Sequence, residues 1–194
     1  ELDPFRYGPY LGLGESLKWT ARGEAKGDYN PSIKALKKAI EINPKDPRAY
    51  GNIGYSLLWD SHQKPFVERN NTLIKEMFEK SLEISPESWT ANYGLGAVYW
   101  WLGDHNKAIE YFEKSIELNP NHAATYEGIG LSYHGLEHDY GVEGGYQKAI
   151  PFYEKAIEID EDHFFSHANF GKTLYRLGRF DEAVTHFNKA LQIS

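Results

Sequence analysis

The sequence contains no cysteine, only one methionine and no long hydrophobic run. Without cysteine, the chain cannot form a disulfide, a zinc–thiolate site or a cysteine nucleophile. This absence leaves the compartment unassigned, with the cytoplasm as the default expectation. No apolar stretch approaches the roughly 18 residues that span a bilayer, so we expect no direct membrane insertion. Basic residues are outnumbered, 21 against 28 acidic ones, which argues against nucleic acid as a partner.

Residues 89–122 form a segment that the flanking sequence copies in stretched or truncated form. Its recurring positions are Leu95, Gly96, Tyr99, Gly103, Ala108, Phe112 and Pro120. On a first helix, Leu95, Gly96 and Tyr99 share one stripe, and the missing side chain of Gly96 allows a second helix to approach closely. On that second helix, Ala108 and Phe112 form the facing seam. The segment therefore predicts one antiparallel helical hairpin.

The order and spacing of these residues resemble the tetratricopeptide repeat, whose pattern recurs about every 34 residues. The resemblance implies an all-α fold, a right-handed superhelical solenoid of antiparallel helix hairpins. It covers nearly the whole chain with about five repeats. The predicted repeats are residues 7–46, 47–88, 89–122, 123–163 and 164–194, with residues 1–6 as the tail of a preceding repeat.

Three hairpins, the first, second and fourth, are lengthened by 6–8 residues between their two helices. The inserts are residues 20–29, 61–70 and 137–145. Because 7 residues make about two helical turns, one extra turn on each helix would lengthen a hairpin without rotating its faces. An irregular loop is an equally good interpretation, since Gly141 and Gly144 lie in the third insert. Both alternatives are compatible with the sequence.

The opening residues, Glu1 to Pro4, match the way in which later repeats end, as at residues 41–44 and 117–120. This match predicts that the chain is a fragment of a longer polypeptide with another repeat upstream. The alternative is a native N-terminus that shares these four residues by coincidence.

No motif in the sequence predicts catalysis. The glycine-rich strings at residues 12–14, 94–96 and 128–130 lie mid-helix and follow no strand, so we interpret them as close-packing positions rather than as nucleotide loops. The pairs His134/His138 and His163/His167 have the spacing that places two imidazoles on one helix face, as in some metal sites. We expect surface or loop histidines instead, because His163 precedes a predicted helix and His138 lies in an insert. The prediction is therefore no catalytic residue, no metal and no cofactor.

The first helix of each hairpin carries the candidate binding residues. The resemblance implies that first helices line a concave groove, with the side chains opposite the packing stripe facing into it. The residues assigned to this groove are Asn52, Tyr55, Trp59, Tyr93, Trp100, Trp101, Leu131, His134, Lys172, Tyr175 and Arg176. Aromatic rings supply large contact areas and are typical binding anchors. The alternative for any one tryptophan is that it fills the junction between adjacent hairpins.

The family also implies one well-defined ligand site, a clamp of Lys, Asn and Arg that holds the C-terminal carboxylate of a peptide. Only Asn52, Asn169, Lys172 and Arg176 have this chemistry, and they are split between the second and fifth repeats. An extended or helical segment with apolar or aromatic side chains fits better. The predicted function is a protein–protein interaction module in a larger multidomain protein. The alternatives are a self-associating architectural scaffold and service to an enzyme domain in the same polypeptide.

Overall fold

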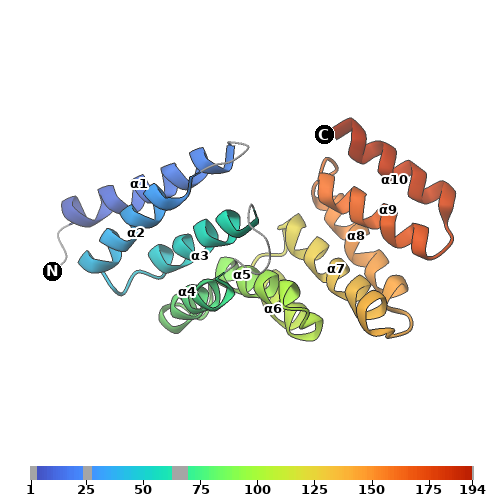
Figure 1. Ribbon diagram of the computed structural model, residues 1–194, viewed down its shortest axis with the longest axis horizontal. Helices are drawn as coiled ribbons and strands as arrows, with labels where there is room; N and C mark the ends of the chain where they lie inside the picture. The colour runs from blue at the N-terminus through green and yellow to red at the C-terminus, as the bar shows by residue number, and fades with distance from the viewer. Residues whose placement is uncertain (1–3, 24–27, 63–69, 194) are drawn as a thin grey trace. The chain divides into compact units, whose positions relative to one another are not determined.

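The computed structural model describes residues 4–23, 28–62 and 70–193. In these residues the regular structure consists of ten α-helices, with no strand (Figure 1). The helices are α1 (Pro4–Gly23), α2 (Asn30–Ile42), α3 (Pro47–His62), α4 (Asn71–Ile84), α5 (Trp89–Trp101), α6 (His105–Leu118), α7 (Ala123–Tyr140), α8 (Gly145–Ile159), α9 (Phe164–Arg176) and α10 (Phe180–Ile193). Among the described helices, none combines the length and the apolar character that crossing a membrane requires.

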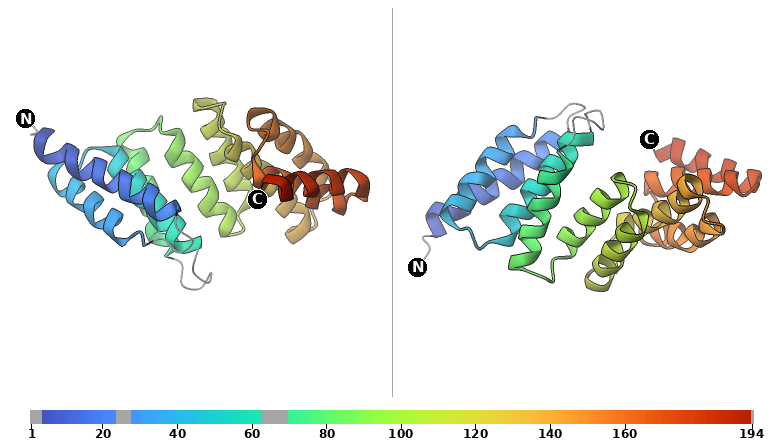
Figure 2. Two further views of the ribbon diagram at one scale, coloured as in Figure 1. Left: turned by 90° about the horizontal axis from the view of Figure 1, so that it is seen from above. Right: turned by 60° about the horizontal axis from the view of Figure 1, so that its bottom comes forward.

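The helices divide into two compact units, residues 1–95 and 96–194, with the boundary inside α5. In the first unit, α1 packs on α2, α2 on α3, and α3 on α4. Figure 2 shows α1 and α2 as an antiparallel pair at the N-terminal end. In the second unit, α7 packs on α8, α8 on α9, and α9 on α10. Each unit is therefore a row of helical hairpins, and the all-helical prediction is confirmed.

Caps at the helix ends explain where several helices begin and end. Gly103 has a φ of 80°, and the Asp104 side chain then accepts a hydrogen bond from the Lys107 amide at the start of α6. The Gly103–Asp104 sequence predicts this arrangement, a helix stop followed by the N-cap of the next helix. From the sequence alone, Asn30 before Pro31 is predicted as an N-cap and Leu73 as the start of a helix, and both predictions are wrong by one or two residues. Tyr29, rather than Asn30, is the N-cap of α2, and α4 begins at Asn71 rather than Leu73 because Asn70 caps it.

The third insert lengthens mainly the first helix of its hairpin. α7 has 18 residues, whereas α5 and α9 have 13 each. Gly141 has a φ of 68°, in the left-handed region, so it ends α7, and a short turn leads to α8 at Gly145. One extra turn on each helix is therefore the wrong interpretation here. In the other two inserts, residues 24–27 and 63–69 lie outside the described residues.

A large side chain of the second helix lies at the centre of each hairpin: Leu36 in the first, and an aromatic residue in the other four. Phe112 is only 2% exposed and lies against Gly96 of α5 and Gly128 of α7. A Cβ atom placed on Gly128 would lie 2.6 Å from the Phe112 ring, closer than real side chains pack. Phe78 of α4 is in the same way packed against Gly94. The interpretation of the glycine-rich strings as close-packing positions is confirmed for Gly14, Gly94, Gly96, Gly128 and Gly130, but it is wrong for Gly12, where no described atom lies within 4 Å of a placed Cβ.

This packing predicts opposite effects for two equivalent glycines in the first unit. Gly94→Ala should destabilise the protein by about 2 kcal/mol, because the new methyl group would overlap the Phe78 ring. Gly12→Ala should stabilise it by up to about 1 kcal/mol, since alanine is the better helix former and no described atom lies within 4 Å of a Cβ placed there. Urea unfolding of both variants measures the difference. Equal effects would contradict the close-packing account.

Candidate functional site

A polar network joins the first helices of the first two hairpins. The Asn52 amide nitrogen of α3 donates to Glu15 Oε1 of α1 at 2.8 Å. Lys18 Nζ of α1 donates to Asn52 Oδ1 at 2.6 Å and lies 5.6 Å from the centre of the Tyr55 ring. We call this set of Glu15, Lys18, Asn52 and Tyr55 the α1/α3 surface. Asn52 therefore uses both ends of its amide group within the chain.

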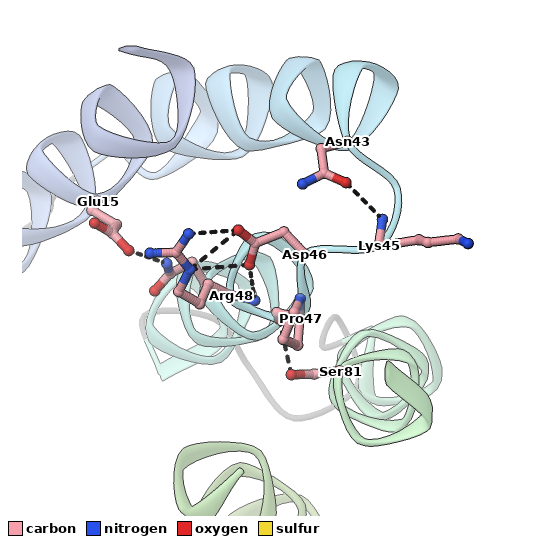
Figure 3. Close-up of polar contacts among 8 residues, drawn as sticks. Glu15, Asn43, Lys45, Asp46, Pro47, Arg48 and Ser81 are labelled. Atoms are coloured by element: carbon pink, nitrogen blue, oxygen red, sulfur yellow. Dashed lines mark hydrogen bonds and ion pairs between the residues drawn. The ribbon is translucent and has the colours of Figure 1, made fainter. Parts of the chain in front are cut away.

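The start of α3 is fixed next to this network. Arg48 Nη2 pairs with Asp46 Oδ2 at 2.6 Å, and the same carboxylate accepts the Arg48 amide at 2.9 Å. Ser81 Oγ of α4 donates to the Pro47 carbonyl at 2.9 Å. Figure 3 shows these contacts and the Glu15 side chain reaching from α1 toward α3. The Arg48 guanidinium is therefore held by a carboxylate in its own turn.

Tyr55 connects α3 to the start of α5. Its hydroxyl donates to the Thr90 carbonyl at 2.7 Å, and its ring stacks on Tyr93 at 6.4 Å and meets Phe78 edge-on at 5.1 Å. Burial raises the pKa of Tyr55 well above its ordinary value, and the neighbouring Tyr93 adds to this shift. Tyr55 is therefore a neutral donor at physiological pH. Tyr93 and Trp59 are half-buried beside the same helix face.

The second unit has a matching network between α7 and α9. Asn169 Nδ2 donates to Glu127 Oε1 at 2.7 Å, and Lys172 Nζ donates to Asn169 Oδ1 at 3.2 Å. Burial raises the pKa of Glu127 to about 7, although Asn169 and Lys172 both favour the charged form. Near neutral pH, this carboxyl group is therefore partly protonated.

His134 lies beside this network, and together they form the α7/α9 surface. Its Nδ1 is 2.9 Å from Thr173 Oγ1, and its ring meets Tyr146 at 4.8 Å. Because Thr173 Oγ1 donates to the Asn169 carbonyl, His134 Nδ1 carries the hydrogen in this contact. Burial lowers the pKa of His134 to about 4, with His138 as a further cause. His134 is therefore neutral at physiological pH.

The candidate residues differ in how much solvent they meet. Tyr175, Lys172 and Arg176 of α9 are exposed, with Tyr175 58% exposed. The half-buried candidates are Asn52, Tyr55, Trp59, Tyr93, Trp100, Trp101, Leu131 and His134. The structure brings Asn52, Tyr55 and Tyr93 together in the first unit. In the second unit, Lys172 and His134 lie on one surface, with Tyr175 and Arg176 on the following turn of α9. These surfaces combine aromatic rings with cationic side chains, an arrangement that suits a ligand with apolar groups and an acidic group.

The histidine pairs are arranged differently from the sequence expectation. His138 lies on α7 with His134, their rings 5.8 Å apart, rather than in a loop between helices. His163 is the N-cap of α9, as expected, and accepts from the Ser166 amide. His167 is buried and faces His186 of α10 rather than His163, with 3.0 Å between the Nδ1 atoms of His167 and His186. Among the described residues, no three His, Cys, Asp or Glu side chains are grouped to hold a metal ion.

Sequence reasoning did not find the carboxylate–amide pairs. The sequence identified Asn52 and Asn169 as polar residues of first helices but did not join them to Glu15 and Glu127. The available signal was that each asparagine lies two residues before a close-packing glycine, Gly54 or Gly171. The two glutamates do not align with each other: Glu15 lies one residue after Gly14, whereas Glu127 lies three residues before Gly130. These positions are one helical turn apart, so an alignment of the repeats does not pair them.

Comparison with known proteins agrees with this architecture. The chain matches the family described as tetratricopeptide repeat over residues 87–162 and 140–194, and the description TPR repeat over residues 25–58. No curated protein sequence matches it. A crystal structure of MamA is 25% identical, with a TM-score of 0.67 and coverage of 93% of this chain and 94% of MamA.

Two further structures share the fold at lower identity. PilF of Pseudomonas aeruginosa is 16% identical with a TM-score of 0.75, covering 97% of this chain and 77% of PilF. A thermophilic TPR protein of Thermus thermophilus is 20% identical with a TM-score of 0.73, covering 97% of this chain and 91% of that protein. Proteins of this fold generally act as non-catalytic scaffolds for protein–protein contacts. From its repeated hairpins, its glycine–aromatic packing and these matches, the chain belongs to the tetratricopeptide repeat family.

Proposed function

We propose that the protein binds an extended or helical peptide segment on its first-helix surfaces. On the α7/α9 surface, the peptide supplies an apolar or aromatic side chain to the Tyr175 ring and an acidic group to Lys172 and Arg176. The observation that carries this proposal is a difference in solvent exposure between the aromatic residues of the first and second helices. On second helices α4, α6 and α8, Phe78, Phe112 and Tyr153 are fully buried in the hairpins, whereas most aromatic residues of the first helices keep solvent-facing area, with Phe170 as an exception.

The two asparagine networks support this choice of ligand. In the peptide-carboxylate clamp, asparagine amides must be available to the ligand. Here Asn52 and Asn169 donate to Glu15 and Glu127 instead. A carboxylate of the ligand bound at Asn52 would be repelled by the Glu15 carboxylate in the first unit. Side-chain recognition by aromatic rings avoids this conflict, because it needs neither amide.

Peptides selected from a random library for binding to the intact protein test the proposal. For a selected peptide, Tyr175→Ala should weaken binding by about tenfold or more, because an aromatic anchor is lost. Leu118→Ala is the control, since Leu118 is 42% exposed at the end of α6, a second helix outside the proposed binding surfaces. It should change the Kd by less than about twofold. Equal effects of the two substitutions, or failure to select any peptide, would contradict the proposal.

The alternative proposal is a self-associating scaffold. It is favoured by one observation, that large apolar side chains such as Leu13 of α1 and Val184 of α10 lie exposed. If the aromatic first-helix residues mediate the association, Trp100→Ala should abolish growth of the mass with concentration in light scattering. If these residues bind a peptide instead, Trp100→Ala should leave the dependence of mass on concentration as it is in the wild type.

A further inference from the structure

Two histidines face each other inside the α9/α10 hairpin. His167 of α9 is 5% exposed, and its Nδ1 lies 3.0 Å from Nδ1 of His186 on α10. The centroids of the two rings are 5.2 Å apart. A contact at this distance between two imidazole nitrogens needs one hydrogen, which one ring donates and the other accepts. The contact between the two helices therefore depends on the protonation of this pair.

The second nitrogen of His167 fixes the direction of the hydrogen bond. His167 Nε2 lies 3.0 Å from the backbone carbonyl oxygen of Glu161, which can only accept, so Nε2 carries a hydrogen. In the neutral ring, Nδ1 of His167 is then the acceptor, and Nδ1–H of His186 is the donor. This leaves Nε2 of His186 without a hydrogen, and a proton can reach it because His186 is only half-buried. The two neutral histidines are therefore different tautomers.

The surroundings of the pair offer little compensation for two positive charges. Burial lowers the pKa of His186 and the neighbouring His167 lowers it further, whereas Glu182 acts in the opposite direction. The Phe170 ring covers His186 at 4.4 Å. Among the described residues, neither imidazole is ion-paired to a carboxylate. The titratable and charged side chains around the pair are Tyr153 of α8, which packs on Phe170, His163 of α9, Glu182 and Lys189 of α10, and Asp160, Glu161 and Asp162 of the turn between α8 and α9.

We propose that the hydrogen bond between His167 and His186 is an acid-sensitive latch that holds α10 on α9. The bond persists when His186 gains a proton at Nε2, because Nδ1–H of the resulting imidazolium is still the donor. A further proton must bind Nδ1 of His167, which is the acceptor of the bond. Two N–H groups and two positive charges would then face each other, so the bond is lost and the rings separate.

The latch should stabilise the hairpin at neutral pH and fail in acid. Because the folded-state pKa of His186 lies below the ordinary value of 6.5, the contribution of the pair is present above pH 6.5 and is lost as the pH falls. The latch uses only the contact between α9 and α10, so it is independent of the proposed peptide binding. We therefore expect α10 to open in acid before α8 does.

Hydrogen exchange of the intact protein, measured by mass spectrometry from pH 7.5 to pH 4 and corrected for the intrinsic pH dependence of exchange, tests the latch. In the wild type, the protection of α10 relative to that of α8 should fall by about tenfold or more. His186→Asn should keep this ratio within about threefold. The asparagine Nδ2 replaces Nδ1 of the imidazole as the donor, and after rotation of the amide its Oδ1 accepts from a protonated His167.

His163→Asn is the matched control. It removes a histidine of the same hairpin whose pKa is also lowered by burial, and asparagine remains a good N-cap for α9. This variant should therefore keep the wild-type fall in the protection of α10. Circular dichroism checks that both variants are folded.

NMR of the imidazole nitrogens in the wild-type protein at pH 8 gives a second readout that needs no variant. We expect His167 to carry its hydrogen on Nε2 and His186 to carry its hydrogen on Nδ1. The same tautomer in both rings, protection of α10 that does not change relative to α8 between pH 7.5 and pH 4, or equal behaviour of His186→Asn and His163→Asn would overturn the proposal.

Discussion

Replacing Phe112 with alanine is expected to lower the local free energy of unfolding around α6 and α7 by about 4 kcal/mol. The ring is 2% exposed and fills the space left by Gly96 and Gly128 on two neighbouring helices. Glycines cannot extend a side chain into the vacated volume, so the cavity would persist unless the helices moved together. The loss therefore includes both the buried surface of the ring and the contact between consecutive hairpins.

Phe187→Ala is the matched control for this prediction, because Phe187 has the same position in its repeat but is only half-buried. It should cost about half as much, near 2 kcal/mol. Hydrogen exchange measured by mass spectrometry reports the free energy of opening for each segment separately, which suits an array in which neighbouring repeats unfold in part. A cost below about 1 kcal/mol for Phe112→Ala, or equal costs at the two positions, would contradict the packing account.

Two half-buried groups on α7 should give the second unit opposite responses to pH. Burial raises the pKa of Glu127 from 4.5 to about 7, so its contribution to stability is present at acidic pH and is lost as the pH rises through 7. Burial lowers the pKa of His134 from 6.5 to about 4, so its contribution is present above pH 6.5 and is lost as the pH falls toward 4. Each response amounts to about 2 kcal/mol after allowance for partial solvent contact. In the wild-type protein they oppose each other between pH 4.5 and 6.5.

Removing either group should expose the response of the other. Glu127→Gln keeps an acceptor for Asn169 and removes the buried charge. The free energy of unfolding of the variant minus that of the wild type should therefore be about 2 kcal/mol larger at pH 8 than at pH 5. His134→Gln should show the reverse, with its stability relative to wild type improving by about 1 kcal/mol on going from pH 8 to pH 5, because only part of the window from 6.5 to 4 is crossed. Urea unfolding followed by circular dichroism at the two pH values measures these differences.

Glu110→Gln on the exposed surface of α6 is the control for the pH experiment, and its stability should follow the wild type. If Glu127→Gln also parallels the wild type at both pH values, the carboxyl group is solvated and the account of its environment is wrong. Lowered pKa values of His122, His163 and His186, each caused first by burial, add to the acid loss in every variant. The comparison between variants is therefore more informative than the wild-type profile alone.

The hairpins could be predicted from the sequence because their signals are local. Gly96 and Phe112 lie at fixed spacings within one repeat, and the structure joins them as expected. The lengthened hairpin could not be assigned in advance, since seven residues fit two helical turns or a loop equally well. The left-handed Gly141 decides it, and the contacts of Asp139 and Tyr140 with His105 and Gly103 of the neighbouring hairpin hold the longer helix. These are tertiary contacts that no local pattern encodes.

The candidate site was predictable only in part, for a similar reason. The spacing of residues placed Asn52 and Tyr55 on a first helix, but not the donors and acceptors that they meet across 35 or 37 residues of chain. Those contacts change the interpretation of Asn52 from a ligand group to a structural one. For Tyr175 and Arg176, exposure agrees with the predicted surface position, and their role in binding stays a prediction.

Tryptophan fluorescence of the intact protein, recorded together with its mass by light scattering, tests the proposed peptide binding most directly. Trp59, Trp100 and Trp101 are half-buried on the first helices, so a bound peptide should remove them from water. We predict that emission shifts to shorter wavelength on addition of a selected apolar peptide and saturates, while the number of protein chains per particle stays unchanged. Emission that no peptide changes, or that shifts only with the mass of the protein itself, would contradict the account.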